Sequence, residues 1–409
     1  MYDILSYVSG FIWGPFTLIL ILGTGIFLSL GLKGFTLTYI AVAFKQLFSK
    51  EEDSSSGEIS SFQSLTTALS ATVGTGNIAG VATAIFVGGP GAIFWMWVSA
   101  VFGMATKFAE AFLAIKYREK NELGETIGGP MYYIKNGLTS KFIVFAYLFA
   151  AAGMIAALGI GNGVQVNSVS QVINNEFGFS TFSIGIVIAI LVALVILGGI
   201  KSIGNITSKL VPVMSLVYIL GGLLIIILNA NQVGYVFNLI VTSAFTTTAA
   251  TGGFAGATVW MALRYGVARG VFSNEAGLGS SPIAHAAAKT NNPVKQGMIS
   301  MLEPLIDTLI VCTITAFVIL MSNQWVGEIN GAVLTVASFE NLLANGKYIV
   351  IFGLILFSFS TIIGWSYYGE KCVEFLFGSG VIIYYRILWI VIIPVAASIE
   401  LNLMWLIAD

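Results

Sequence analysis

Charged residues are scarce in this sequence. Asp, Glu, Lys and Arg make up only 9% of its 409 residues, whereas 57% are hydrophobic, and the mean hydropathy is +0.92. Soluble domains carry about 25% charged residues, which keep their surfaces solvated. The composition therefore excludes an ordinary soluble domain and predicts a chain that is largely surrounded by lipid.

Cysteine, histidine and excess positive charge are also missing. Cys312 and Cys372 lack metal-ligand spacing and an obvious disulfide context, and His285 is the only histidine, which excludes a histidine-based metal cluster. The net charge of −1 gives no basic footprint for nucleic acid. No HExxH, GxSxG or nucleotide-binding loop occurs. We therefore expect neither an enzyme nor an organic cofactor nor a nucleic-acid partner.

Long apolar runs are what the sequence has in abundance. A membrane-spanning helix needs about 20 apolar residues. Runs separated by polar or Gly/Pro punctuation predict one transmembrane domain over residues 1–409. Its predicted spans cover residues 11–32, 61–88, 91–117, 142–174, 181–199, 206–229, 253–288, 296–321, 348–377 and 381–397. A further apolar segment starts near Asn402 and stops at Asp409, so we expect the last helix to be truncated.

The basic residues predict an orientation for these spans. If the N-terminus lies outside, the inside loops carry Lys33, Lys45, Lys50, Lys116, Arg118, Lys120, Lys135, Lys141, Lys201, Lys209, Lys289, Lys295 and Lys371. The outside loops then carry Lys347 alone. Because cytoplasmic loops are enriched in Lys and Arg, the N-terminus is predicted to lie outside.

Two predicted spans contain helix-breaking residues near the middle of the bilayer. Span 61–88 contains Gly-Thr-Gly-Asn at 74–77, and span 253–288 contains Ser-Asn-Glu-Ala-Gly-Leu-Gly at 273–279. Glycine costs about 1 kcal/mol in a helix interior. Irregular backbone at membrane depth is tolerated where it lines a cavity or is buried in protein. One such motif alone is more often a packing feature.

The positions of the two breaks are more informative than either break alone. Each opens a set of five helices, which predicts two repeats over residues 61–229 and 253–409 that follow an extra N-terminal helix at 11–32. Because five is odd, the second repeat enters the membrane in the opposite orientation. Interruptions at matched positions of inverted repeats point to a transport site.

Several strings resemble the amino acid carrier, or sodium:alanine symporter, family of the amino acid–polyamine–cation transporter superfamily. They are TALSATVGTGNIAGVATAI, GGPGAIFWMW, KFAEAFLAIKYR, GGPMYYI, FSNEAGLGSSPIAHAAA and SFSTIIGWSYYGE, and the similarity runs from about Trp13 to about Leu376. The resemblance implies an all-α, leucine-transporter-type fold with a five-plus-five inverted repeat and one extra N-terminal helix. It also implies Na⁺-coupled uptake of alanine, with glycine as a further candidate, across a prokaryotic plasma membrane.

The first break and its neighbours supply candidate substrate ligands. Backbone N–H groups of Gly74, Thr75 and Gly76 are expected to receive the substrate carboxylate, because the glycines allow close approach. The amide oxygen of Asn77 is expected to help bind a cation, the alternative being helix packing. Gln165 is expected to hydrogen-bond the substrate, the alternative being a bond between helices.

The second break supplies the remaining candidates. Gly277 and Gly279 are expected to bring carbonyl groups to the substrate ammonium, and Asn274 is assigned to the same site. Glu275, an acid at membrane depth, either binds the substrate or pairs structurally with Arg269, Lys107 or a helix end. Aromatic candidates for walls that limit side-chain size are Trp365 and Phe272.

A sodium site is expected where the resembling fold has one. Hydroxyl oxygens are suited to Na⁺, and Ser360 and Thr361 lie adjacent in an apolar span. The alternative for both is a bond to their own helix. The resemblance places the sodium between this helix and the first break, with the matching carbonyls at Ser70, Val73 and Phe357.

Two rival interpretations stay open at this point. Proton coupling would use Glu275 or Asp307, and a channel would need a continuous polar pore.

A structural ion pair is also predicted. Lys107 and Glu110 lie three residues apart and are expected to pair on one helix face.

Overall fold

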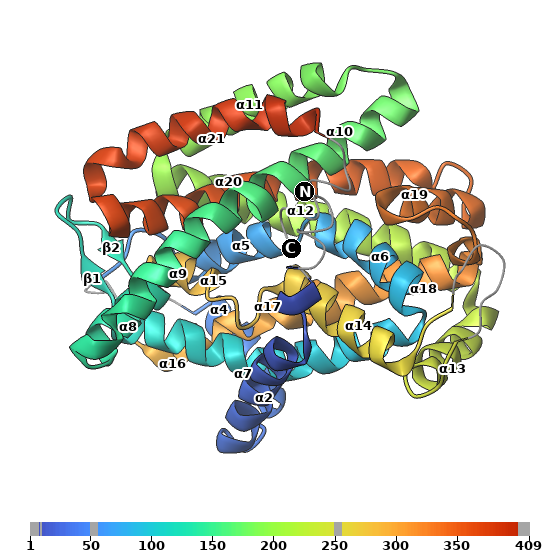
Figure 1. The fold of residues 1–409 in the computed structure, drawn as a ribbon, viewed down its shortest axis with the longest axis horizontal. Helices are drawn as coiled ribbons and strands as arrows, with labels where there is room; N and C mark the ends of the chain where they lie inside the picture. Colours follow the sequence, from blue (N-terminus) through green and yellow to red (C-terminus); the bar gives the residue numbers. More distant parts are fainter. Residues whose placement is uncertain (1–7, 9, 50–55, 249–255, 400–409) are drawn as a thin grey trace.

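The computed structural model describes residues 8, 10–49, 56–248 and 256–399 (Figure 1). Within these ranges the only sheet is an antiparallel pair, β1 (Glu119–Lys120) and β2 (Thr126–Ile127), in which Glu119 lies opposite Ile127. All other regular structure is helical, which confirms the predicted all-α class.

The first half of the described chain contains helices for each predicted span. They are α2 (Pro15–Gly31), α3 (Phe35–Thr38), α4 (Ile40–Leu47), α5 (Ser61–Thr72), α6 (Ala79–Gly88), α7 (Gly91–Lys116), α8 (Pro130–Gly137), α9 (Ile143–Ala156), α10 (Val164–Phe177), α11 (Thr181–Ile196), α12 (Gly199–Leu228) and α13 (Val233–Ser243). A 3₁₀ turn, η1 (Thr75–Asn77), joins α5 to α6, and a π-helical segment, η3 (Ala157–Gly163), joins α9 to α10.

The second half of the described chain is also helical. Its helices are α14 (Val259–Asn274), α15 (Ser281–Ala286), α16 (Pro293–Ser300), α17 (Leu302–Pro304), α18 (Thr313–Ser322), α19 (Gly331–Leu342), α20 (Lys347–Phe377) and α21 (Ile382–Ala397). A second π-helical segment, η5 (Leu305–Cys312), lies between α17 and α18. Short 3₁₀ turns complete the chain at Ser140–Phe142, Ala230–Gln232, Gln324–Val326 and Ser379–Val381.

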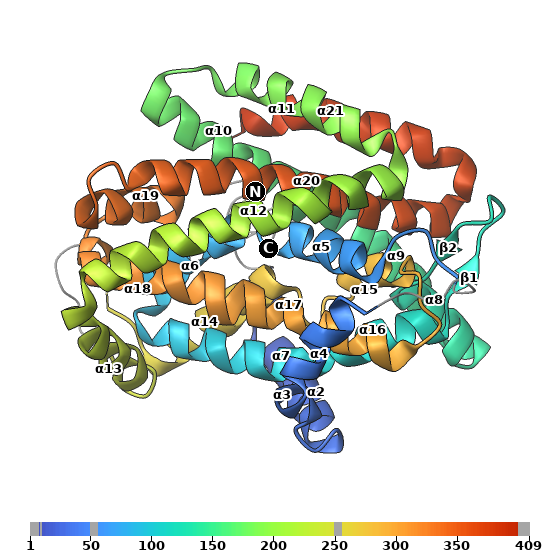
Figure 2. The ribbon, with the colours of Figure 1, turned by 180° about the vertical axis from the view of Figure 1, so that it is seen from behind.

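The helices form a bundle whose long members run along the long axis of the molecule (Figures 1 and 2). α7, α12 and α20 lie along this axis, with α10, α11 and α21 on one side and α2 on the other. The broken pairs α5–α6 and α14–α15 lie in the middle of the bundle. Six helical stretches of the described chain are long and apolar enough to cross a membrane, and α2, α6 and α11 are shorter apolar helices.

Large apolar side chains on the outer helices are exposed. Leu194 on α11, together with Leu216 and Ile227 on α12, are more than half exposed. Such surfaces are stable when they face lipid, because water would not solvate them. With the spanning helices, they mark a multi-pass membrane protein.

Local signals explain where the central helices begin. Ser60 and Gln63 form a capping box at the start of α5: the Ser60 hydroxyl accepts from the Gln63 N–H at 3.1 Å, and the Gln63 amide oxygen accepts from the Ser60 N–H at 2.9 Å. At the start of α14 the Thr258 hydroxyl accepts a hydrogen bond from the N–H of Met261 at 3.2 Å. The starts of both broken helices are therefore encoded locally.

Some elements were not predicted. The sequence predicts no helix at α19, although this helix packs against α6 and α18. The stretch 116–141, predicted as a loop, contains α8 and the β1–β2 hairpin. The expected segment from Asn402 lies outside the described residues. The division into repeats over 61–229 and 253–409 stays a prediction.

Candidate functional site

The first helix break lies at the predicted residues. α5 ends at Thr72, and the N–H of Gly74 is bonded by the Asn77 side-chain oxygen at 2.8 Å instead of a helical carbonyl. The N–H of Thr75 donates to Oε1 of Gln165 at 3.1 Å. Side-chain oxygens therefore occupy two of the three N–H groups that were predicted to receive a carboxylate.

Glycine is required here because other groups approach closely. A Cβ added to Gly74 would lie 2.5 Å from Oγ1 of Thr361 and 3.0 Å from Oε1 of Gln165. A Cβ added to Gly76 would lie 3.2 Å from the Cα of Ser273, just before the second break. The two breaks are therefore packed against each other.

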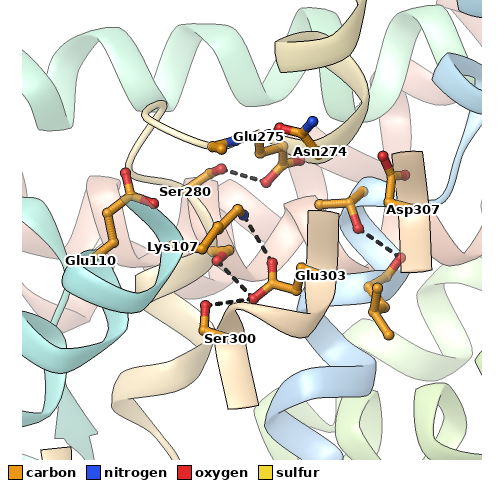
Figure 3. A network of polar contacts seen from close by, with 12 residues as sticks. Lys107, Glu110, Asn274, Glu275, Ser280, Ser300, Glu303 and Asp307 are labelled. Atoms are coloured by element: carbon orange, nitrogen blue, oxygen red, sulfur yellow. Dashed lines mark hydrogen bonds and ion pairs between the residues drawn. The ribbon is translucent and has the colours of Figure 1, made fainter. Parts of the chain in front are cut away.

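The second break is held by polar contacts within itself and to α7. Glu275 ends α14 in the left-handed conformation, with φ of 58°, and its carboxylate accepts a hydrogen bond from the Ser280 hydroxyl (Figure 3). The N–H of Gly279 donates to Oε1 of Glu110 at 3.2 Å. Glu275 was predicted either to bind the substrate or to form a structural pair. In the structure its carboxylate bonds to Ser280, within the same break.

Asn274 has partners on both of its amide atoms. Its Nδ2 donates to Oγ1 of Thr308 at 3.0 Å, and its Oδ1 accepts from the N–H of Ala276 at 3.0 Å. The side chain therefore fixes the turn after α14 and ties it to η5.

Asp307 connects the two breaks. Its Oδ1 accepts from Nδ2 of Asn77 at 2.6 Å, and its Oδ2 accepts from Oγ of Ser273 at 2.8 Å and from Oγ1 of Thr308 at 2.7 Å. The side chain is fully buried and forms no ion pair within the described part of the chain. Sequence reasoning noted Asp307 only as a proton-coupling candidate, although an acid in the apolar string LIDTLIV was a sufficient signal.

The five predicted sodium ligands lie at one junction between α5 and α20, and all are buried. They are Ser70 and Val73 at the end of α5, and Phe357, Ser360 and Thr361 on α20. Oγ of Ser360 donates to the Phe357 carbonyl at 2.9 Å, which is the own-helix bond named as the alternative. Oγ1 of Thr361 instead reaches across to the Val73 carbonyl at 3.4 Å.

The electrostatics of this junction favour a cation. The last carbonyls of a helix lack intrahelical donors and carry partial negative charge. Oγ1 of Thr361 and the carbonyl oxygen of Val73 lie 3.4 Å apart. Two oxygens at this separation can both bind one cation at about 2.3–2.6 Å, which is the range for Ca²⁺, an ion similar in size to Na⁺.

The two aromatic candidates are both buried but have different neighbours. Trp365 is buried and packs so closely on Gly161 that an added Cβ would lie 2.2 Å from the Cβ of Trp365. With Tyr368 and Ser280 it lines a cavity of about 190 Å³ between α9, α15 and α20. Phe272 is buried, and its ring centroid lies 5.6 Å from the Arg269 guanidinium.

Two sequence-based expectations do not fit the structure. Gly277 is exposed, and an added Cβ would meet Ile21 of α2, so it is not brought to the first break. The predicted Lys107–Glu110 pair is wrong, because Lys107 binds Oε2 of Glu303 at 2.9 Å (Figure 3). A pair three residues apart contributes only about 0.2–0.5 kcal/mol in an isolated helix, whereas a buried ammonium needs a fully desolvated partner.

Comparison with known proteins decides the family. The sequence profile of the sodium:alanine symporter family matches residues 1–409. The chain belongs to this family. The sodium/alanine symporter AgcS of Methanococcus maripaludis is 50% identical over 414 residues, which cover 100% of this chain and 90% of that protein.

Solved structures support the fold of this symporter. The structure of MhsT in complex with L-phenylalanine has a TM-score of 0.59 at 14% identity and covers 84% of this chain and 81% of that one. A substrate-bound, outward-open Na⁺-coupled sialic acid symporter has a TM-score of 0.53 at 14% identity and covers 98% and 82%. The predicted leucine-transporter-type fold class is confirmed. The symporter is a transporter and not an enzyme, as predicted, and its family membership confirms the predicted class of function, sodium-coupled alanine symport.

Proposed function

We propose that this symporter imports alanine, and neutral amino acids of similar size such as glycine, together with Na⁺ across a prokaryotic plasma membrane, with its N-terminus outside. The observation that carries this proposal is the contact between the two helix breaks, Gly76 against Ser273, beside the oxygen-rich α5–α20 junction. Backbone groups freed by unwinding can hold an ion and a zwitterion side by side.

The substrate is held by backbone groups of both breaks. Its carboxylate takes the N–H groups of Gly74, Thr75 and Gly76 and displaces the side-chain oxygens of Asn77 and Gln165 that occupy two of them. Oγ1 of Thr75 is buried without a hydrogen-bond partner among the described residues, so it is available to the substrate.

The other end of the substrate meets the second break. Its ammonium lies near the carbonyl groups of residues 272–274, with Glu275 and Gly279 close by in the chain. Trp365 and Phe272 limit the size of the substrate side chain. Gly277 is left out of the proposed site because it faces α2.

Na⁺ binds to the carbonyls of Ser70, Val73 and Phe357 and to the hydroxyls of Ser360 and Thr361. By drawing the Val73 carbonyl toward α20, the ion fixes the backbone that presents Gly74 and Thr75 to the substrate. Reciprocity requires that the substrate raise Na⁺ affinity by the same factor. The membrane potential adds about 2.3 kcal/mol per charge per 100 mV to uptake.

The double variant Ser360→Ala/Thr361→Ala tests the sodium site. Two lost oxygen ligands are expected to raise the Na⁺ concentration for half-maximal alanine uptake by about tenfold or more, as for a loss of about 1.4 kcal/mol. Purified protein in proteoliposomes is assayed for radiolabelled alanine uptake over a range of Na⁺ concentrations. Ser366→Ala is the matched control, because that buried hydroxyl on α20 donates only to its own helix, to the Ile363 carbonyl at 2.7 Å.

Unchanged Na⁺ activation in the double variant would remove these hydroxyls from the site. Uptake that persists in Na⁺-free buffer and follows a pH gradient would favour proton coupling through Glu275 or Asp307.

A further inference from the structure

A second buried polar cluster lies between the two broken helices and contains none of the proposed sodium or substrate ligands. His285 on α15 places Nε2 at 2.6 Å from Oε1 of Glu303 and Nδ1 at 2.5 Å from Nε2 of Gln296. Nε2 of Gln296 also lies 2.7 Å from Oγ of Ser64 on α5. All four side chains are fully buried.

The hydrogen-bond partners assign the protonation of this histidine. In the amide orientation of the structure, Nε2 of Gln296 donates to Nδ1 of His285, which accepts and carries no proton. Nε2 then carries the proton and donates to the Glu303 carboxylate. Glu303 also receives Lys107 at 2.9 Å and Ser300 at 2.8 Å (Figure 3). In this state the imidazole is neutral.

The site also contains an acceptor for a second proton on the imidazole, the amide oxygen of Gln296. A proton on Nδ1 would face the Gln296 Nε2 donor, and rotation of the amide would replace that donor by Oε1. Oε1 of Gln296 has no hydrogen-bond partner among the described residues, so rotation breaks no bond at that atom. The Ser64 hydroxyl, which now donates to the Ser61 carbonyl at 3.0 Å, would have to turn toward Oε1.

We propose that His285 is a proton-binding site, and that the Gln296 amide passes its protonation state to α5 through Ser64. The proton is taken up from water on Nδ1, the Glu303 carboxylate keeps its bond to Nε2, and no other group changes its charge. Because α5 and α15 are halves of the two broken helices, the proton biases how these halves pack against each other.

Titratable groups on the surrounding elements set the field at His285. They include Glu58 before α5, Lys107 and Glu110 on α7, Arg118 after α7, Glu275 in the second break, Glu303 on α17 and Tyr368 on α20. Of these, Glu303 contacts the imidazole directly, and Lys107 compensates the charge of Glu303. A positive imidazole therefore has a carboxylate partner in place.

Proton binding affects transport only if the two packings of α5 and α15 differ in proton affinity. In the structure, Ser64 on α5 is linked to His285 on α15 through Gln296 on α16, and separation of the two half-helices would break this link. The pH on the side from which these halves separate is therefore expected to change the rate of transport.

Nitrogen-15 NMR of the histidine-labelled full chain in lipid tests the proton site directly. His285 is the only histidine, so a single pair of ring signals is expected once the protein is purified without a histidine tag. The titration runs from about pH 8 to pH 5. Only Nε2 should be protonated at its start, and lowering the pH should protonate Nδ1 as well. A ring that stays in one state over this range overturns the proposal.

Variants distinguish the switch from a merely buried histidine. Gln296→Leu removes the amide that bonds to Nδ1 in both protonation states, so the NMR midpoint is expected to change. Asn167→Leu, which removes a buried amide on α10 bonded to the Ala396 and Ile399 carbonyls, should leave the midpoint unchanged. An unchanged midpoint in Gln296→Leu would show that the Gln296 amide does not respond to protonation of His285.

Transport provides the functional test. His285→Gln keeps a donor toward Glu303 and an acceptor toward Gln296 but cannot take up a proton. In proteoliposomes, the dependence of the alanine uptake rate on internal pH is expected to flatten in this variant, and an unchanged pH profile would contradict a role in transport. The NMR titration does not depend on alanine being the substrate, so failure of the proposed function and failure of the proton site can be told apart.

Discussion

Gly74 shows how one missing side chain holds the site open. Oγ1 of Thr361 and Oε1 of Gln165 lie where its Cβ would be, at 2.5 and 3.0 Å. Gly74→Ala is therefore expected to push α20 and α10 away from the break and to lower Na⁺-dependent alanine uptake by about tenfold or more, a loss of about 1.4 kcal/mol. The measurement is initial uptake in proteoliposomes at saturating Na⁺.

Gly80→Ala is the matched control, because an added Cβ at Gly80 on α6 meets nothing within 4 Å. Alanine also favours a helix interior over glycine by about 1 kcal/mol. This variant should keep full uptake and unfold at the same or a higher temperature. Full uptake by Gly74→Ala would mean that the close packing at the first break is not needed for transport.

At the scale of single residues, the sequence predicted features that depend on neighbouring residues in the chain. The breaks at 74–77 and 273–279 follow from glycine at membrane depth, which is visible in a single sequence. The partner of Lys107 could not be predicted, because Glu303 is separated from it by 196 residues and only the packing of α17 against α7 brings the two together. An acid at position 307 was visible in the sequence as a functional candidate, but its partners Asn77 and Ser273 could not be predicted, since they lie on two other helical segments.

At the scale of elements, Arg118 ties the two half-helices α5 and α15 together at one end of the bundle. Its guanidinium donates to the carbonyls of Ala286 and Ala288, both at 2.8 Å, at the end of α15 and just beyond it, and to those of Thr290 at 2.6 Å and Ser56 at 3.0 Å. The main chain before α5 bonds to the same segment through Ile59 and Ala287. A cation at the end of α15 also complements the helix dipole.

Arg118→Ala is expected to let α15 move away from α5 more often. Charge-assisted bonds contribute about 1.5–3 kcal/mol each, so a loss of a single such bond raises the open population by about tenfold. Cys372, which lines the cavity beside Ser280 and is buried, should then react faster with a thiol reagent. The rate of Cys372 labelling is followed by mass spectrometry.

Lys135→Ala is the control for this measurement. Lys135 pairs with Glu119 at 2.7 Å near the same end of the molecule, but the pair is exposed and belongs to α8 and β1. Exposed pairs contribute about 0–1 kcal/mol, so labelling of Cys372 should stay at the parent rate. Equal rates in Arg118→Ala and in the parent would show that Arg118 does not hold α15 closed.

The helices themselves were predictable to different degrees. Long apolar spans such as α7, α12 and α20 were predicted because a run of about 20 or more apolar residues typically forms a membrane-spanning helix. α19 was missed because it is short, lies between polar turns and is stabilised by tertiary contacts, including the bond from the Thr335 hydroxyl to the Ile78 carbonyl at 3.0 Å. The π-helical segments η3 and η5 leave no comparable sequence signal, although such segments are frequent at functional sites.

At the scale of the whole molecule, several basic residues lie in segments at one end of the bundle. The β1–β2 hairpin, α8 and α15 lie at one end of the long axis, and α13 and α19 lie at the other (Figure 1). Lys116, Lys120 and Lys135 belong to the first end, and Lys347 belongs to the second. Because positively charged loops stay on the cytoplasmic side, this asymmetry predicts that the hairpin faces the cytoplasm and that α19 faces outward.

Single cysteines at the two ends test this orientation. Glu122 between β1 and β2 and Glu328 before α19 are both exposed, whereas the native Cys312 and Cys372 are buried and give a low background. In intact cells a membrane-impermeant maleimide should label Glu328→Cys and should reach Glu122→Cys only after the membrane is permeabilised. The opposite pattern would place the hairpin outside. It would also reverse the side from which α5 and α15 separate, so that external rather than internal pH would act on His285.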